Sequence, residues 1–344
     1  MNSVLPEGYR PILDQRESEL AIKLIKDFFE RNLAAELRLS RVTSPLFVPR
    51  GSGINDDLNG IERPVRFPVK NLGEKEMEVV QSLAKWKRMA LADYQYKAGY
   101  GLYTDMNALR PDDDIDATHS IYVDQWDWEL VMEEGQRSRS FLYRIVTRIY
   151  EVLRRTEFLV CEHYPAIRPE LPEEIHIVHA EELARRWPDI HAQEREYRIC
   201  KEKGAVFICG IGAVLSDGAI HGGRAPDYDD WSSPGEDGLA GLNGDIMVWD
   251  GVRKEALELS SMGIRVNREA LLSQLEIRGA AERATLYWHT RLLSGEFPQT
   301  IGGGIGQSRL CMYLLRKAHI GEVQASVWDE ETLAACKRAS VPLL

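Results

Sequence analysis

The stretch Gly302-Gly-Gly-Ile-Gly-Gln-Ser-Arg309 places four glycines at the start of a helix that the sequence predicts over 305–317. Clustered glycines allow a backbone to lie close against a flat or charged ligand, and this helix would carry Arg309 in its first turns. The stretch lacks the Gly-Lys-Ser/Thr ending of a P-loop. A glycine-rich turn before a core helix explains the string equally well, so it needs support from other parts of the chain.

A second stretch, Glu258-Leu-Ser-Ser-Met-Gly-Ile-Arg265, predicts a strand with an acid at one end and an arginine at the other. Their odd separation puts the two side chains on opposite faces of a regular strand, unless a bulge over 261–263 changes the phase. An exposed ion pair at a sheet rim is the alternative interpretation. Arg110 ends another predicted strand, over 101–109, where a guanidinium can grip a phosphate through two hydrogen bonds.

Polar residues alternate with tryptophans in Gln125-Trp-Asp127-Trp-Glu129, which predicts a strand with one polar face. A helix predicted over 83–96 has cations near its start, where they oppose the helix dipole, and this indicates an anionic ligand. We assign that role to Lys87. For Lys85 and Arg88 the expected surroundings are a solvated basic surface.

Carboxylates concentrate in two other places, Asp227, Asp229 and Asp230 in one loop and Asp245 further on. Such groups suit Mg²⁺ or the recognition of an amine, although acidic loops of this kind are often only solvated. The loop 51–60, rich in glycine, asparagine and aspartate, is a third polar segment.

The order of the predicted elements favours one α+β domain over 1–344. A helix over 15–37 runs into a strand over 41–48 that carries Pro45, and further strands are predicted over 120–128, 205–211, 245–249 and 256–266. Further helices are predicted over 136–160, 181–200, 267–277 and 281–293. Strands form a block instead of alternating with helices, so a mostly antiparallel sheet flanked by helices is expected.

Composition excludes several classes of protein. The 344 residues include 43 Lys+Arg and 54 Asp+Glu, a formal net charge of −11, which argues against extended nucleic-acid or anionic-membrane surfaces. The five cysteines form no CxxC pair, and the first fifty residues show no signal peptide. We expect a cytoplasmic protein without a membrane partner.

In chain order, the helix with its Pro45 strand, Arg110, the Glu258 to Arg265 strand and the glycines before Arg309 resemble the three signature motifs of class II aminoacyl-tRNA synthetases. The strings 82–88, 122–129, 225–232 and 299–309 resemble most closely the ammonia-dependent asparagine synthetases, the aspartate–ammonia ligase family. This resemblance, which covers essentially the whole chain, implies a class II catalytic core without an anticodon-binding module, and a homodimer. It also implies synthesis of asparagine from L-aspartate, ammonia and ATP through an aspartyl adenylate, without tRNA.

The resemblance also implies roles for single residues. Arg110 would hold the α-phosphate and Arg309 the far end of ATP, with Mg²⁺ near Glu258 and Asp245. Aspartate would be held by a set of charged and polar side chains: Lys87 and Arg265 for a carboxylate, Asp127 and Asp229 for the α-ammonium, and Ser261 and Gln125 for further hydrogen bonds. Asp56 would handle the ammonium, with Asp57 as the alternative.

Two other hypotheses compete with this one. A reduced aspartyl- or asparaginyl-tRNA synthetase would need an anticodon-binding module, for which the roughly 14 residues before the first helix leave no room. A synthetase-like sensor without catalysis usually loses its phosphate-handling side chains, which this chain keeps. Asn2, where a glutamine-dependent enzyme would need a cysteine nucleophile, indicates free ammonia as the nitrogen donor.

Overall fold

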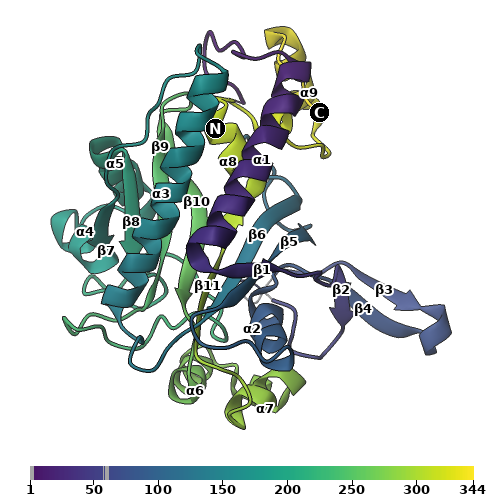
Figure 1. The fold of residues 1–344 in the computed structure, drawn as a ribbon, viewed down its shortest axis with the longest axis vertical. Coiled ribbons are helices and arrows are strands. Elements are labelled where there is room, and N and C mark those ends of the chain that lie inside the picture. Colours follow the sequence, from purple (N-terminus) through teal and green to yellow (C-terminus); the bar gives the residue numbers. More distant parts are fainter. Residues whose placement is uncertain (1–3, 57, 59–61) are drawn as a thin grey trace.

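The computed structural model describes residues 4–56, 58 and 62–344. Its main sheet contains β1 (Leu39–Arg41), β5 (Gly101–Leu109), β6 (Tyr122–Val131), β7 (His176–His179), β8 (Ala205–Cys209), β9 (Asn243–Asp250), β10 (Glu255–Ile264) and β11 (Thr300–Gly306). They lie in the order β1-β5-β6-β11-β10-β9-β8-β7 (Figure 1). The outer pairs β1–β5 and β7–β8 are parallel and the other pairs are antiparallel. The predicted α+β class with a mostly antiparallel sheet is confirmed.

The glycine-rich stretch is a strand of this sheet, and not a turn. It forms β11 between β6 and β10, and α8 (Gln307–Leu314) begins directly after it, two residues later than predicted. A Cβ atom at Gly302 would overlap the Glu129 carboxylate, and one at Gly304 would overlap the Gln125 amide. The glycines therefore leave room for the polar side chains of β6 to lie across the neighbouring strand.

The predicted bulge exists but lies earlier in β10. The register between β10 and β9 shifts between Glu258 and Ser260, not over 261–263. An extra residue on one strand reverses which face the following side chains occupy. Glu258 and Ser261, three positions apart, consequently both line the cavity described below.

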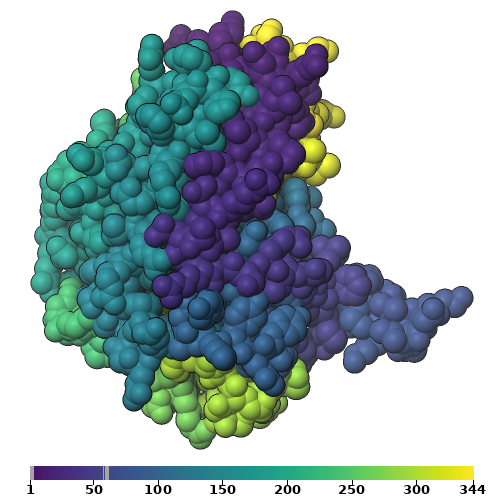
Figure 2. All heavy atoms as spheres, viewed as in Figure 1, coloured from purple at the N-terminus to yellow at the C-terminus, as the bar shows by residue number. Residues whose placement is uncertain are grey.

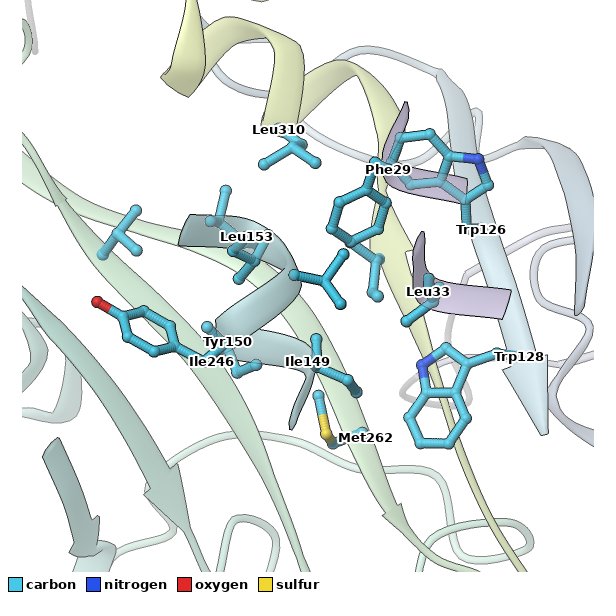
Figure 3. Close-up of a cluster of buried hydrophobic side chains, with 14 of the residues drawn as sticks. Phe29, Leu33, Trp126, Trp128, Ile149, Tyr150, Leu153, Ile246, Met262 and Leu310 are labelled. Carbon is cyan, nitrogen blue, oxygen red and sulfur yellow. The ribbon is translucent and has the colours of Figure 1, made fainter. Parts of the chain in front are cut away.

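One face of the sheet is apolar and packs against α1 (Gln15–Leu37), α3 (Arg139–His163) and α8. α1 and α3 lie side by side across this face (Figure 1), and Figure 3 shows Phe29 and Leu33 of α1 close to Trp126 and Trp128 of β6. The rings of Phe29 and Trp126 are 4.7 Å apart between centroids. The alternation in β6 thus sends the tryptophans into the core, as predicted.

On the opposite face, the helices of the described residues cover the two ends of the sheet. At one end lie α2 (Ala84–Asp93), α6 (Arg268–Ile277), η2 (Ala281–Thr285) and α7 (Tyr287–Leu293), and at the other α4 (Ala180–Arg186) and α5 (Ala192–Lys203). The single helices predicted over 181–200 and 281–293 are therefore each two elements. Pro188 lies between α4 and α5, where its missing N–H cannot continue a helix. The middle of this face, over β6, β11 and β10, is left to polar side chains.

A small second sheet projects from the body of the molecule (Figure 2). It contains β2 (Phe47–Pro49), β4 (Lys75–Val79) and β3 (Arg66–Val69), with η1 (Lys70–Leu72) at its tip. The strand predicted over 41–48 is split between β1 and β2, with Pro45 in the connection. The other two strands of this sheet, β3 and β4, lie outside the elements that the sequence predicted, as do η3 (Ile320–Glu322) and α9 (Glu330–Ala339) near the C-terminus.

In the described part of the chain no helix combines the length and the apolar composition needed to cross a bilayer. The five cysteines are all free thiols, consistent with their irregular spacing.

Candidate active site

A cavity of about 780 Å³ opens on the polar middle of the sheet. Its floor is formed by β6, β10 and β11. Its walls are formed by the start of α2, by the loops 110–120 and 223–229, and by Asp56, Leu58 and Glu62. The predicted site residues that line it come from all of these segments: Asp56, Lys87, Arg110, Gln125, Asp127, Asp229, Glu258, Ser261, Arg265 and Arg309. Asp245 lies just behind the lining, and Asp57 lies outside the described residues.

Lys87 is completely buried at the floor of the cavity. Its ammonium donates to the Asp127 carboxylate and to the backbone carbonyl of Gly303 at 2.9 Å. Burial lowers the pKa of Lys87, and the charge of Asp127 acts against that shift. The pair places one cation and one carboxylate next to each other, both buried. Charges interact more strongly with a ligand in such surroundings than at the surface, where water screens them.

Arg265 is the second buried cation, and it lies between two carboxylates. It forms ion pairs with Glu129 at 2.8 Å and with Asp229. Burial acts to raise the pKa of Glu129, but Arg265 holds it below its ordinary value. For Asp229 the effect of burial is the larger one, and its pKa is raised although the same arginine opposes the shift. Glu129 also accepts from the Thr300 hydroxyl at 2.7 Å and orients the guanidinium.

Glu129 was missing from the predicted site. The alternation in β6 had already placed it on the same face as Gln125 and Asp127, so the signal was present in the sequence. Its partner Arg265 is more than a hundred residues away along the chain. The two residues come together because β11 pairs with β6 on one side and with β10 on the other.

Asp56 lies in a loop that neighbouring side chains hold in place. The Asn55 amide oxygen accepts from the backbone N–H of Asp56 at 3.0 Å and of Gln81 at 2.9 Å, which ties the loop to the entrance of α2. One Asp56 carboxylate oxygen accepts from the Leu58 N–H at 3.0 Å. The side chain is only 3% exposed yet lines the cavity, so a small ligand in the cavity can reach it.

Two arginines lie toward the outer part of the cavity. The Arg110 guanidinium donates to the backbone carbonyl of Gln81 at 3.1 and 3.0 Å. Arg309, at the start of α8, donates to the carbonyl of Glu258 at 3.2 Å, and the Glu258 carboxylate lies 4.0 Å away. Backbone carbonyls hold both guanidinium groups in place, and two cations on one side of the cavity suit a polyanionic ligand.

Asp245 forms an ion pair with Arg224, which the sequence did not predict. Arg224 donates to both of its carboxylate oxygens and lies 3.4 Å from the Ser261 hydroxyl. Burial raises the pKa of Asp245 to about 6; Arg224 opposes the rise and the charge of Glu258 adds to it. Among the described residues, no three His, Cys, Asp or Glu side chains gather closely enough to hold a metal by themselves.

The prediction of a solvated basic surface at Lys85 and Arg88 is wrong. Lys85 is buried in an ion pair with Asp227 at 3.0 Å, and Arg88 is buried with its guanidinium on the carbonyls of Pro298 and Val266 at 3.0 and 2.6 Å. Burial lowers the pKa of Arg88 to about 9. The acidic loop is equally buried, because Asp227, Asp229 and Asp230 are each paired with a cation.

This fold defines the class of protein to which the chain belongs. Two solved structures that it resembles are asparaginyl-tRNA synthetases. One, from Pyrococcus horikoshii in complex with asparaginyl-adenylate, gives a TM-score of 0.67 at 14% identity over 91% of this chain and 70% of that chain. The other, from Entamoeba histolytica, gives a TM-score of 0.62 at 15% identity over 90% of this chain and 67% of that chain. The fold is that of the class II aminoacyl-tRNA synthetase catalytic core.

Sequence comparisons narrow the class to one family. The aspartate-ammonia ligase family matches residues 16–340. The aspartate–ammonia ligases of Parabacteroides distasonis and Clostridium perfringens are 59% and 53% identical to this chain over 341 and 340 residues, 99% of this chain in both cases and 99% and 98% of the relative. The chain belongs to the aspartate–ammonia ligase family, as its motifs predicted.

Proposed function

We propose that this protein converts L-aspartate, ammonia and ATP into L-asparagine, AMP and pyrophosphate through a β-aspartyl adenylate. The observation that carries the proposal is the meeting, in one cavity, of buried cations for a carboxylate, outer arginines for a triphosphate and the carboxylate of Asp56. Membership of the aspartate–ammonia ligase family supports the same reaction.

Aspartate is assigned to the buried end of the cavity. Lys87 and Arg265 bind its α-carboxylate, while Asp127 and Asp229, each paired with one of these cations, accept hydrogen bonds from its α-ammonium. Gln125 and Ser261 complete the contacts. This orientation points the β-carboxylate toward the outer arginines.

The first step transfers an adenylyl group. An oxygen of the β-carboxylate attacks the α-phosphate of ATP, a new O–P bond forms, and pyrophosphate leaves with the electron pair of the broken bond. Two anions must approach each other, so the step requires cations placed beforehand. Arg110 binds the α-phosphate and Arg309 the distal phosphates, both from the positions in which backbone carbonyls already hold them.

Mg²⁺ fits one edge of this site. Glu258 and Asp245 supply hard oxygen donors and affect each other's charge, and Mg²⁺ is commonly held by one or two carboxylates together with substrate phosphates. When bound, Mg²⁺ would neutralise phosphate charge. Within the protein, Arg224 would have to release Asp245 for that carboxylate to take part.

The second step uses ammonia. Asp56 binds the ammonium ion, accepts one of its protons and presents neutral ammonia to the carbonyl carbon of the adenylate. A C–N bond forms, the C–O bond to AMP breaks, and AMP leaves with the electron pair of that bond. The nitrogen loses a second proton to solvent, and asparagine remains. The loop contacts of Asn55 fix the Asp56 backbone, so that the carboxylate is held close to that carbon.

We further propose that the chain acts as one catalytic domain, in the cytoplasm and without tRNA or a membrane partner. The chain forms a homodimer in this proposal, with an interface made by α1 and the Pro45 segment. A monomer in analytical ultracentrifugation would contradict the proposed dimer.

The proposed reaction is tested with purified protein, aspartate, ATP, Mg²⁺ and ammonium, without tRNA or glutamine. We expect asparagine in equal amounts with AMP and pyrophosphate. Aspartate-dependent pyrophosphate exchange without asparagine would favour a synthetase with another acceptor, and no nucleotide turnover would favour a non-catalytic sensor.

A further inference from the structure

α7 contacts three separate segments of the site although none of its residues lines the cavity. The Trp288 backbone N–H donates to the carbonyl of Ser52 at 3.2 Å, in the loop that carries Asp56. The Trp288 indole N–H donates to the carbonyl of Lys85 at 2.7 Å, in the helix that carries Lys87. His289 contacts Asp227, in the loop that carries Asp229, at 2.9 Å. One helical turn therefore joins the segments assigned to ammonia and to aspartate.

His289 is fully buried and has two different neighbours, one on each side of its ring. On the first side, Nε2 lies 2.9 Å from the Asp227 carboxylate oxygen that also binds the Lys85 ammonium at 3.0 Å. Arg283 faces the same oxygen at 3.7 Å. Although burial acts to raise it, the pKa of Asp227 lies well below its usual value because of Lys85 and His289. The carboxylate is therefore charged and can only accept, so the His289 Nε2–H donates this hydrogen bond.

On the second side, the ring packs directly against the backbone of Gly53. A Cβ atom at Gly53 would come within 2.9 Å of Nδ1 of His289, and Gly53 has a φ of +73°, which a residue with a side chain rarely adopts. Gly53 precedes Asp56 by three residues. The imidazole, together with Leu286 at the same distance, thus sets the position of this loop over the cavity. Nδ1 has no hydrogen-bond partner among the described residues.

We propose that His289 is a positioning residue that serves the two steps of the reaction separately. Its ring fixes the position of the Asp56 loop for the ammonia step. Its Nε2–H fixes the positions of Asp227 and Lys85, and through α2 that of Lys87, for the aspartate step. The inference rests on the proposed function. It follows that removal of either contact should impair one step more than the other, which general destabilisation would not do.

Two substitutions separate the contacts. His289→Gln keeps an N–H for Asp227 but removes the ring that supports Gly53. His289→Phe keeps the ring but removes the donor to Asp227. Aspartate-dependent ATP–pyrophosphate exchange reports the first step and the KM for aspartate, and asparagine formation at varied ammonium reports the KM for ammonia.

For His289→Gln we expect the KM for ammonium to rise about tenfold or more, with exchange within about twofold of wild type. For His289→Phe we expect the reverse, a rise of about tenfold in the KM for aspartate with the KM for ammonium near wild type. His163, an exposed histidine on α3, gives matched controls in His163→Gln and His163→Phe, which should change neither.

Equal losses in both steps for both variants would overturn the inference, and so would unchanged constants. The glutamine variant decides the loop half of the proposal by itself if the phenylalanine variant does not fold. Absence of asparagine formation by the wild-type protein would instead contradict the proposed function, and the inference with it.

Discussion

Single residues set the chemistry of this site, and Arg110 shows how. Its guanidinium is held by two hydrogen bonds to one backbone carbonyl, so its charge is in place before the phosphates approach. Arg110→Ala should lower aspartate-dependent pyrophosphate exchange about 100-fold or more, since one such cation contributes roughly 3 kcal/mol to the transition state. Arg198→Ala, at an exposed arginine on α5, is the matched control. Undiminished exchange would remove Arg110 from the phosphate site.

Asp56 is predicted to act only after the adenylate has formed. Asp56→Asn keeps the size of the side chain and removes the charge that binds ammonium and accepts its proton. Pyrophosphate exchange should remain near wild type while asparagine formation falls about 100-fold or more. The variant Asp57→Asn, measured alongside, distinguishes the two neighbours. Asparagine formation that persists in Asp56→Asn and fails in Asp57→Asn would transfer the role to Asp57.

At the same scale, motifs predicted the side chains that line the cavity better than the side chains that pair with each other. Gln125, Asp127, Ser261 and Arg265 line the cavity as expected. Lys85 was assigned to a solvated surface, and this was wrong because its partner Asp227 is 142 positions away along the chain. No local sequence pattern predicts an ion pair over that separation. Whether a charged residue near the start of a helix is buried cannot be predicted from its sequence position, because burial depends on tertiary contacts.

At the scale of elements, α1 is attached to the sheet through its apolar stripe. Phe29 is fully buried against Trp126, whereas Leu20 on the same helix is 62% exposed. Phe29→Ala should lower the free energy of unfolding by about 3–5 kcal/mol, and Leu20→Ala by less than about 1 kcal/mol. Denaturant unfolding measures both. Equal effects would contradict the packing of α1 against β6.

η3 is capped at its N-terminus by a histidine, His319, whose neutral form is required. His319 accepts from the Gly321 N–H at 3.0 Å, and burial, with the charge of Arg253, lowers its pKa from 6.5 to about 4. Between pH 6.5 and pH 4 the unfolded chain binds a proton at His319 and the folded chain does not. The contribution of neutral His319 to the free energy of unfolding is therefore fully present above pH 6.5 and is lost as the pH falls toward 4. Its size between pH 7 and pH 5 is about 2 kcal/mol.

His319→Asn keeps a cap acceptor that does not titrate. The variant should therefore lose about 2 kcal/mol less than wild type when denaturant unfolding is compared at pH 7 and pH 5. The same loss in both proteins would show that His319 is protonated in the folded state.

Elements with strong periodicity were predictable, and elements fixed by distant contacts were not. The 3.6-residue pattern predicted α1 with both of its ends, and alternation predicted β6. β11 was not predicted as a strand: its glycines fitted a ligand-binding segment or a turn before a helix, and only its position between β6 and β10 shows that they form a strand. The bulge in β10 was expected from Ser261 and Gly263, but the strand bends earlier, where Glu258 turns toward the cavity.

On the scale of the whole molecule, the two faces of one sheet have different tasks. The apolar face, covered by α1, α3 and α8, holds the fold together, and the polar face keeps buried charges in pairs that a substrate can rearrange. Each cation next to a carboxylate is prepared for a ligand such as aspartate, which carries both kinds of charge. The orientation of that ligand decides whether the chain makes asparagine or an aminoacyl group for transfer.

The most direct test of this account follows an oxygen label. Aspartate with ¹⁸O in both oxygens of its β-carboxylate is incubated with the protein, ATP, Mg²⁺ and ammonium, and the AMP is analysed by mass spectrometry. Attack by the β-carboxylate on the α-phosphate predicts one ¹⁸O in AMP and one in asparagine. AMP that gains its label only when the α-carboxylate carries the ¹⁸O would contradict the proposed orientation of aspartate and the adenylate that follows from it.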